Sequence, residues 1–258
     1  MSASPSISLA GRTVLVTGAS SGIGRGFALS LARSGANVVI GARRIALLEE
    51  LKSEIEALGV SALPVAMDVA DEASVIAAFD AAEERFGEVH SVVANAGITV
   101  PGRAVDLSVD SFDQVMDVNL KGTFLTVREA ARRMMVKDST TRAHGRIVII
   151  SSITAHHVTA HFGPYSATKA AVNQLGRVLA RDWAGKGINV NMIEPGYMHT
   201  DLTEGLENTA TGKALLSSFP RPRFMDTATL DFPLLWLCSD ASAEVTGSVF
   251  TLDDGQSL

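Results

Sequence analysis

The 258-residue sequence has little cysteine, little charge and no long apolar run, and each shortage excludes a class of protein. Its single cysteine, Cys238, excludes an internal disulfide framework and suits a reducing compartment. The net charge of −6 argues against a nucleic-acid-binding protein. No apolar run approaches the ~18 residues of a membrane span, and residues 1–9 lack the basic start and apolar core of a signal peptide. These absences predict a soluble, cytoplasmic protein that does not bind membranes.

Hydrophobic residues make up 47% of the chain and charged residues 19%, which excludes a disordered chain. At roughly 150 residues per domain, the length allows one large domain or two small ones. No linker, internal repeat or low-complexity segment divides the sequence. We therefore expect residues 1–258 to form a single domain.

Short apolar runs alternate with longer amphipathic ones along the chain. The apolar runs predict strands at 13–17, 37–41, 62–69, 89–94, 146–151, 188–193 and 249–252. The amphipathic runs predict helices at 25–34, 45–58, 72–86, 108–136 and 164–184. This alternation predicts an α/β fold of the doubly wound, Rossmann-like type, with a seven-stranded parallel sheet between two helical layers. Ligands of such sheets bind beyond the carboxyl ends of the strands.

A glycine-rich turn joins the first predicted strand to the first helix. Glycines allow the backbone to approach a ligand closely, and the free N–H groups of a helix start favour a pyrophosphate. The turn could also be a tight connection without a ligand. Its candidate nucleotide-binding residues are Gly18, Ser20, Ser21, Gly22, Ile23 and Gly24.

The end of the second strand indicates which dinucleotide would bind. An NAD-selective site places an acidic residue there to accept the ribose hydroxyls, whereas the 2′-phosphate of NADP prefers a cation. This sequence has Arg43 and Arg44 and no acidic residue at that point. Both arginines could instead be solvated charges at a helix start. We expect NADP(H) to be preferred over NAD, with Arg43 on the 2′-phosphate.

Two further strand ends complete the predicted nucleotide site. Asp68 and Val69 close the third strand, where Asp68 could accept a hydrogen bond from an adenine amine or cap the next helix. Asn95, Ala96 and Gly97 follow the fourth strand and are small enough for a ribose to lie against their backbone.

Candidate catalytic groups follow the fifth strand. Tyr165 and Lys169 are four residues apart, so they share one face of the predicted helix 164–184. A nearby ammonium favours the phenolate and would lower the pKa of the tyrosine toward neutral pH. Ser152, at the strand end, could hold a substrate oxygen beside the phenol. The tyrosine–lysine spacing alone is common on surface helices, and only its combination with the glycine-rich turn makes it informative.

Taken together, these motifs resemble the short-chain dehydrogenase/reductase family, and the match covers nearly the whole chain. The glycine-rich turn and Asn95–Gly97 match two family elements, and Ser152, Tyr165 and Lys169 match the family's catalytic residues. The resemblance adds Asn119 as a fourth catalytic residue. It also adds a cofactor-binding element at Pro195, Gly196 and Thr200.

The resemblance implies hydride transfer at the nicotinamide, coupled to proton transfer through Tyr165. Lys169 would lower the tyrosine pKa and bind the nicotinamide ribose, as Tyr165 also contacts the cofactor. Asn119 would hold a water in a proton relay. The resemblance further implies a homodimer or homotetramer that pairs helices 108–136 and 164–184.

Several positions depart from the family pattern. Glu194, before Pro195, is unusual beside a nicotinamide and could face solvent or tune the site. Asp254 stands where the family more often has glycine, and Pro233 should kink a helix or delay its start. His156, His157 and His161 lie between Ser152 and Tyr165, but no carboxylate or cysteine accompanies them, so we expect no metal.

Residues 197–225 are long for a connector and predict a lid over the substrate. Its apolar residues could line a pocket or pack on the domain: Met198, Leu202, Leu206, Leu215, Leu216 and Phe219.

The sequence thus predicts an NADP(H)-dependent oxidoreductase that interconverts a secondary alcohol and a ketone with apolar flanks. Its alternatives are a 3-oxoacyl-thioester reductase, a sugar-acid dehydrogenase and, from another class, a non-catalytic nucleotide-binding scaffold.

Overall fold

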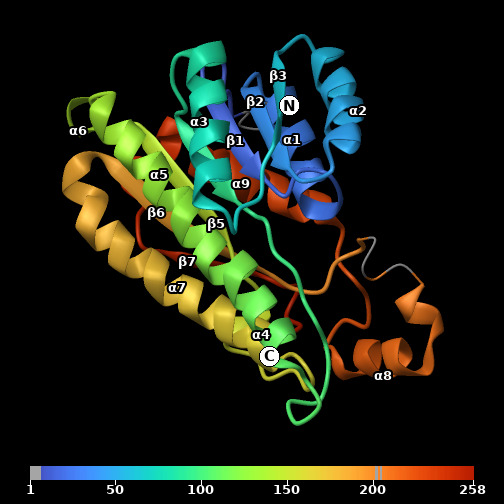
Figure 1. The fold of residues 1–258 in the computed structure, drawn as a ribbon. Coiled ribbons are helices and arrows are strands. Elements are labelled where there is room, and N and C mark those ends of the chain that lie inside the picture. The colour runs from blue at the N-terminus through green and yellow to red at the C-terminus, as the bar shows by residue number, and fades with distance from the viewer. Residues whose placement is uncertain (1–6, 201–202, 204) are drawn as a thin grey trace.

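A seven-stranded parallel sheet runs through the centre of the computed structural model (Figure 1), which describes residues 7–200, 203 and 205–258. The strands are β1 (Thr13–Thr17), β2 (Asn37–Ala42), β3 (Ala62–Ala66), β4 (Ser91–Ala94), β5 (Gly145–Ile150), β6 (Ile188–Pro195) and β7 (Val249–Leu252). Their order is β3-β2-β1-β4-β5-β6-β7. The order reverses between β1 and β4, which is where a ligand crevice is expected in such a sheet.

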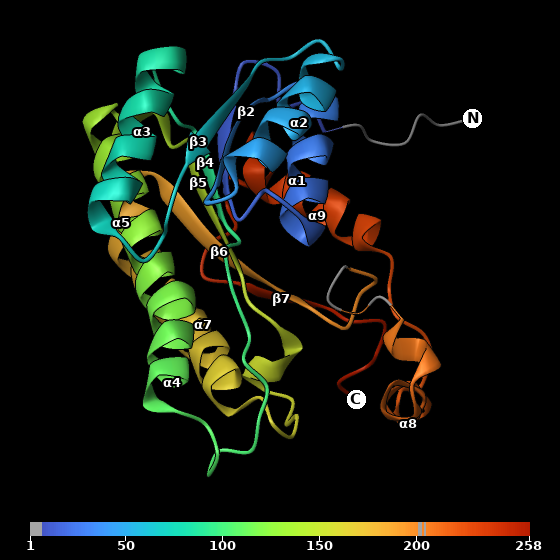
Figure 2. The same ribbon diagram turned by 45° about the vertical axis from the view of Figure 1, so that its right-hand side comes forward.

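Helices cover both faces of the sheet, as Figure 2 shows. One layer holds α1 (Gly22–Arg33), α2 (Ile45–Glu56) and α9 (Asp231–Cys238). The other holds α3 (Glu72–Phe86), α4 (Val109–Met116), α5 (Gly122–Val136) and α7 (Gly163–Trp183). Two short helices, α6 (Ser139–Arg142) and α8 (Ala210–Ser218), lie outside these layers. The predicted doubly wound, three-layer fold is confirmed.

Alternate strand residues fill two separate cores, and this explains the valine- and isoleucine-rich runs. Val14 and Val16 of β1 pack with Phe27 of α1, whereas Leu15 packs with Phe79 of α3 on the opposite face. All five residues are essentially inaccessible to solvent. Burying each such side chain stabilises the fold by about 1.5–3 kcal/mol. The two cores therefore stabilise the sheet, whose carboxyl edge carries the site.

The stretch predicted to be helical at 108–136 is helical from Val109 to Val136, but it is not one continuous α-helix. A π-helical turn, Asp117–Lys121, separates α4 from α5 and contains Asn119. Such turns hold one residue more than an α-helical turn, and they occur often at functional sites. A stripe of apolar residues at helical spacing cannot reveal one inserted residue.

Other boundaries differ less. The third strand ends at Ala66 and not at Val69, because its partner β2 ends at Ala42, the residue paired with Ala66. Helix α9 begins at Asp231, so Pro233 lies in its first turn, where a proline is tolerated. Residues 1–6 and Leu202, which entered the predictions above, lie outside the described residues. Within the described part of the chain, no helix has the length and apolarity to cross a bilayer.

Candidate active site

The glycine-rich turn lies at the carboxyl end of β1, beside the loop after β4. Gly18 has φ +68°, and a Cβ there would lie 2.9 Å from Ala96 Cα. A Cβ on Gly24 would lie 2.4 Å from the Gly18 carbonyl oxygen. Because no side chain fits at either position, the two loops pack backbone against backbone at the point where the strand order reverses.

Side-chain hydrogen bonds fix these two loops to each other. Thr17 Oγ1 accepts from the backbone N–H groups of Asn95 and Ala96, each at 3.0 Å. Asn95 Nδ2 donates to the Thr17 carbonyl at 2.9 Å. The first turn of α1 has no side-chain cap, so its N–H groups are suited to bind a phosphate. The predicted residues from Gly18 to Gly24 and from Asn95 to Gly97 thus share one edge of the sheet.

The arginine that contacts the glycine-rich turn is Arg44. Its Nη2 donates to Ser20 Oγ at 2.9 Å and to Ser21 Oγ at 2.6 Å. Arg43 is exposed beside it at the end of β2. The two hydroxyls and the Arg44 guanidinium form a polar group that fits a phosphate. From the sequence we expected Arg43 to be the main phosphate contact.

Asp68 and Val69 lie at the same edge of the sheet. Asp68 Oδ1 accepts from the Ala70 N–H at 3.0 Å in a tight turn. The cap of α3 is Asp71, whose side chain accepts from the Ala73 N–H. The alternative role of Asp68 as the helix cap is therefore wrong. Buried Val69 packs against Gly122 at the start of α5.

Ser152 and Tyr165 form a hydrogen-bonded pair at the end of β5. Ser152 Oγ also accepts from the Thr154 N–H at 3.2 Å and thereby caps a short 3-10 turn, Ile153–Ala155. Tyr165 is partly exposed as a whole residue, but its phenol lies deep in the protein. Burial raises the pKa of Tyr165, and the Ser152 hydrogen bond opposes that rise.

Lys169 lies one helical turn beyond Tyr165 and is fully buried. Its Nζ donates to the Ile150 carbonyl at 2.8 Å and lies 5.4 Å from the centre of the Tyr165 ring. Burial lowers the pKa of Lys169 to about 8. The predicted net lowering of the Tyr165 pKa by Lys169 is wrong for this structure, because burial of the phenol dominates and the ammonium is directed at a backbone carbonyl.

Asn119 links this group to the loop after β4. Its amide accepts from the Ile98 N–H at 2.8 Å and donates to the Ile98 carbonyl at 2.9 Å. Its Nδ2 also lies 3.2 Å from Thr168 Oγ1 on α7. A Cβ on Gly97 would lie 3.4 Å from Asn119 Oδ1 and 3.6 Å from Lys169 Nζ. Asn119, Lys169 and Gly97 are therefore neighbours, and the glycine keeps room open at this point.

Pro195 ends β6 at the same edge of the sheet, and Gly196 follows it. A Cβ on Gly196 would lie 2.4 Å from Gln256 Oε1, so the C-terminal loop packs directly on this backbone. Thr200 lies in a turn, where its N–H donates to Thr203 Oγ1 at 2.9 Å. Gln256 Nε2 donates to the carbonyls of Tyr197 and Arg223, near the two ends of the predicted lid, which contains α8.

Comparisons with known proteins agree with this arrangement. The family model described as short chain dehydrogenase matches residues 12–211. The chain belongs to this family. A 2-dehydro-3-deoxy-D-gluconate 5-dehydrogenase of Pseudoalteromonas atlantica is 34% identical over 250 residues, covering 96% of each chain. A 3-oxoacyl-acyl-carrier-protein reductase of Thermotoga maritima is 34% identical, covering 96% of this chain and 98% of that protein.

A solved structure adds a third relative. The NADPH-dependent 3-quinuclidinone reductase of Rhodotorula rubra superposes with a TM-score of 0.89 at 31% identity, over 97% of this chain and 93% of that one. This short-chain dehydrogenase is accordingly an oxidoreductase whose family binds a nicotinamide cofactor.

Glu194 lies in a position that its sequence neighbours do not reveal. It is buried, and its carboxylate accepts from Asn173 Nδ2 at 2.5 Å and Thr251 Oγ1 at 2.8 Å. His156 Nδ1 lies 3.2 Å from Oε2, the same oxygen that accepts from Thr251. Of the two alternatives, exposure to solvent is wrong. Its position beside Pro195 was the only signal in the sequence.

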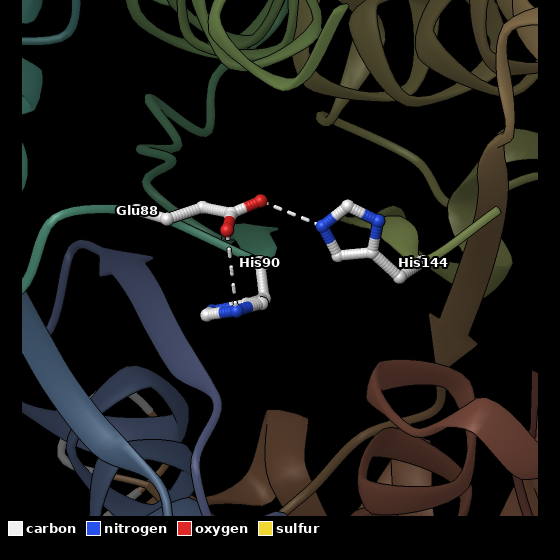
Figure 3. A group of neighbouring side chains, drawn as sticks. All are labelled: Glu88, His90 and His144. Carbon is white, nitrogen blue, oxygen red and sulfur yellow. Dashed lines mark hydrogen bonds and ion pairs between the residues drawn. The ribbon is translucent and has the colours of Figure 1, made fainter. Parts of the chain in front are cut away.

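A second cluster, formed by Glu88, His90 and His144, lies at the opposite end of the sheet (Figure 3). His144 Nε2 donates to Glu88 at 2.6 Å, and Arg142 donates to the same carboxylate at 2.9 Å. His90 Nδ1 accepts from the Thr13 N–H at 3.0 Å, so its Nε2 carries the proton and faces Glu88. A metal would need the lone pair of that nitrogen. The hydrogen bonds and the neighbouring arginine therefore favour an ion cluster over a metal site.

Proposed function

We propose that this short-chain dehydrogenase is an NADP(H)-dependent oxidoreductase that interconverts a secondary alcohol and a ketone. The observation that carries the proposal is the group formed by Ser152, Tyr165 and Lys169 at the carboxyl edge of the sheet, where the glycine-rich turn also lies. A non-catalytic scaffold would not need a buried lysine and a buried phenol on adjacent turns of one helix.

The residues around the glycine-rich turn fit a dinucleotide. The uncapped start of α1 would bind the pyrophosphate, and the ribose would lie along Asn95–Gly97. Ser20, Ser21 and Arg44 would hold the 2′-phosphate, with exposed Arg43 beside them. Pro195, Gly196 and Thr200 would contact the nicotinamide side. When bound, NADPH supplies the hydride.

Tyr165 would carry the proton. Its raised pKa keeps the phenol protonated at neutral pH, which suits donation of the proton to a carbonyl oxygen during ketone reduction. Ser152 would hold that oxygen through its hydroxyl. Lys169, with a pKa of about 8, can change its charge near neutral pH and so pass a proton on toward Asn119. Oxidation of the alcohol would use the same groups in reverse.

The names of the relatives support two alternatives for the substrate, a sugar acid and a 3-oxoacyl thioester. Steady-state oxidation of NADPH with apolar ketones, a keto sugar acid and an acyl thioester would separate the three. We expect the highest kcat/KM with an apolar ketone, because apolar residues of the proposed lid at 197–225, such as Met198 and Phe219, are buried. No turnover with any carbonyl compound would overturn the proposed function.

The cofactor preference has its own test. Arg44→Ala and Arg43→Ala should each raise the Kd of NADPH about tenfold, the loss of roughly one charge-assisted hydrogen bond, with little change for NADH. Arg33→Ala is a suitable control, because Arg33 ends α1 away from the glycine-rich turn. An unchanged ratio of the two dissociation constants in both variants would refute the preference for NADP(H).

We also infer that the enzyme works in the cytoplasm as a homodimer or homotetramer. Exposed apolar side chains on α4, α5 and α7 support the pairing of these helices, and they include Phe112, Phe124 and Val178. Charged replacements of these three residues should yield monomers in sedimentation experiments.

A further inference from the structure

Glu194 is a buried carboxylate to which the proposed reaction gives no role. Only 3% of the residue is exposed, and it directly precedes the proposed nicotinamide contacts Pro195 and Gly196. Removing a carboxylate from water costs several kcal/mol unless donors replace the water. Two hydrogen-bond donors, Asn173 and Thr251, and the nearby His156 ring satisfy this need, and each of the three belongs to a different part of the site.

Asn173 belongs to the catalytic helix α7. Tyr165, Lys169 and Asn173 follow one another at steps of four residues and therefore share one face of that helix. Thr251 belongs to β7, where it is the register partner of Glu194. The carboxylate thus ties the catalytic helix to the two strands at its side.

His156, the third group around Glu194, connects the carboxylate to the turn that begins at Ser152. His156 ends the 3-10 turn Ile153–Ala155, which begins at Ser152. Its N–H donates to the Ile153 carbonyl, while its ring Nδ1 points at Glu194 and about half of the side chain is exposed. The ion pair therefore holds the far end of a turn whose near end is capped by Ser152. Asp253, the other charged group that acts on His156, lies in the C-terminal loop.

We propose that Glu194 is a positioning residue that holds the Ser152 turn, through His156, against the helix carrying Tyr165. The proposal rests on the proposed function for the role of Ser152 and Tyr165. Without the carboxylate, the turn loses its only ion pair in the described structure, and the Ser152 hydroxyl is no longer held beside the phenol. Proton transfer should then slow, while dinucleotide binding should persist.

The test compares Glu194→Ala, His156→Ala and Glu194→Gln. The glutamine variant keeps an acceptor for Asn173 or Thr251 but lacks the carboxylate charge that faces His156, so it should lose nearly as much activity as Glu194→Ala. Asn189→Ala is the matched control: Asn189 is a buried polar residue of the same strand, but it binds the Ser242 and Ala243 carbonyls at the opposite end of β6. All four variants are compared at equal folded fraction by thermal unfolding.

One readout does not need turnover. The chain contains two tyrosines, Tyr165 and Tyr197, so the tyrosinate absorbance of Tyr165 can be isolated by subtracting the titration of Tyr165→Phe. Since the Ser152 hydrogen bond lowers the Tyr165 pKa, its loss should raise that pKa in Glu194→Ala. His156→Ala should give a shift in the same direction, and Asn189→Ala none.

Kinetics supply the second readout. With a ketone that the wild type reduces, Glu194→Ala should lower kcat about tenfold and leave the NADPH Kd within twofold. A double variant that combines Glu194→Ala with His156→Ala should be no worse than Glu194→Ala alone, because both residues act through one contact. Additive losses, an unchanged Tyr165 titration, or an equal effect of Asn189→Ala would overturn the proposal. If the wild type reduces no ketone, the proposed function fails, and the titration still decides the role of Glu194.

Discussion

The two ends of the sheet differ in how their charged side chains are paired. At the amino end, the Glu88 carboxylate is bound by His144, Arg142 and His90 at once. At the carboxyl end, the buried Lys169 ammonium donates to one backbone carbonyl, that of Ile150, within the part of the chain that the structure describes. Charges that are fully paired stabilise a fold, whereas an underpaired ammonium keeps a pKa near neutral and can exchange a proton. The comparison separates a structural charge cluster at the amino end from the proposed chemical site at the carboxyl end.

The largest expected effect is at the carboxyl end. Tyr165→Phe removes the proton donor and should lower kcat by about 10³-fold, within the range of general acid–base catalysis. The NADPH Kd and the free energy of unfolding should change little, because the phenyl ring keeps its packing. Fluorescence titration with NADPH and single-turnover reduction measure both. Equal loss of binding and turnover would contradict the assignment.

At the amino end, Glu88→Gln should have the opposite effect: it should lower the free energy of unfolding and leave kcat unchanged. The substitution leaves His144 and Arg142 without their carboxylate, and a hydrogen bond to a charged group in such a partly buried site contributes about 1.5–3 kcal/mol to the unfolding free energy. Chemical denaturation measures this loss. At temperatures where the variant is folded, kcat should equal that of the wild type. A reduced kcat with unchanged stability would remove the distinction between the two ends.

Acid should destabilise the amino end through His90. Burial lowers the pKa of His90 to about 4, below its ordinary value of 6.5. The neutral ring is therefore favoured in the folded protein, so the stability it supports is complete above pH 6.5 and is lost as the pH falls toward 4. Allowing for partial exposure of the ring, we expect a loss of about 2 kcal/mol.

His90→Asn isolates this contribution, because its side-chain oxygen can accept from the Thr13 N–H without titrating. Denaturation midpoints between pH 4 and 6.5 should depend less on pH in this variant than in the wild type. His161→Asn replaces an exposed histidine and should keep the wild-type pH dependence. Identical profiles for all three proteins would show that His90 is not the group responsible.

The smallest expected effect is a loss of stability at another acidic residue of the amino end, Asp240. Asp240 pairs with buried Arg12 at 2.8 Å, but 76% of the Asp240 side chain is exposed. Water screens such a pair, so Asp240→Asn should cost less than about 1 kcal/mol. A thermal unfolding scan beside Glu88→Gln would rank the two acids. A larger loss of unfolding free energy for Asp240→Asn would mean that exposure does not determine how much a charged side chain stabilises the amino end of the sheet.

The sequence predicted the sheet and both halves of the site because their signals are local. Apolar strands, the glycine-rich turn and the Tyr165–Lys169 spacing each lie within a few residues. The Glu88 cluster was missed because Glu88 and His144 are 56 positions apart and meet only through the order of β4 and β5. The role of Arg44 over Arg43 depends on side-chain direction at a helix start, and the pKa of Tyr165 depends on burial that a sequence does not show.

The π-helical turn Asp117–Lys121 decides where the Asn119 side chain lies along the helices from α4 to α5. Such a turn takes up one residue more than an α-helical turn, so the helix continues on both sides while the side chains within the turn change direction. Deleting a single residue there would restore α-helical geometry and separate the Asn119 amide from Ile98, while every amino acid of α5 stayed the same. Alignment gaps at this position would therefore separate chains with different active sites despite similar composition.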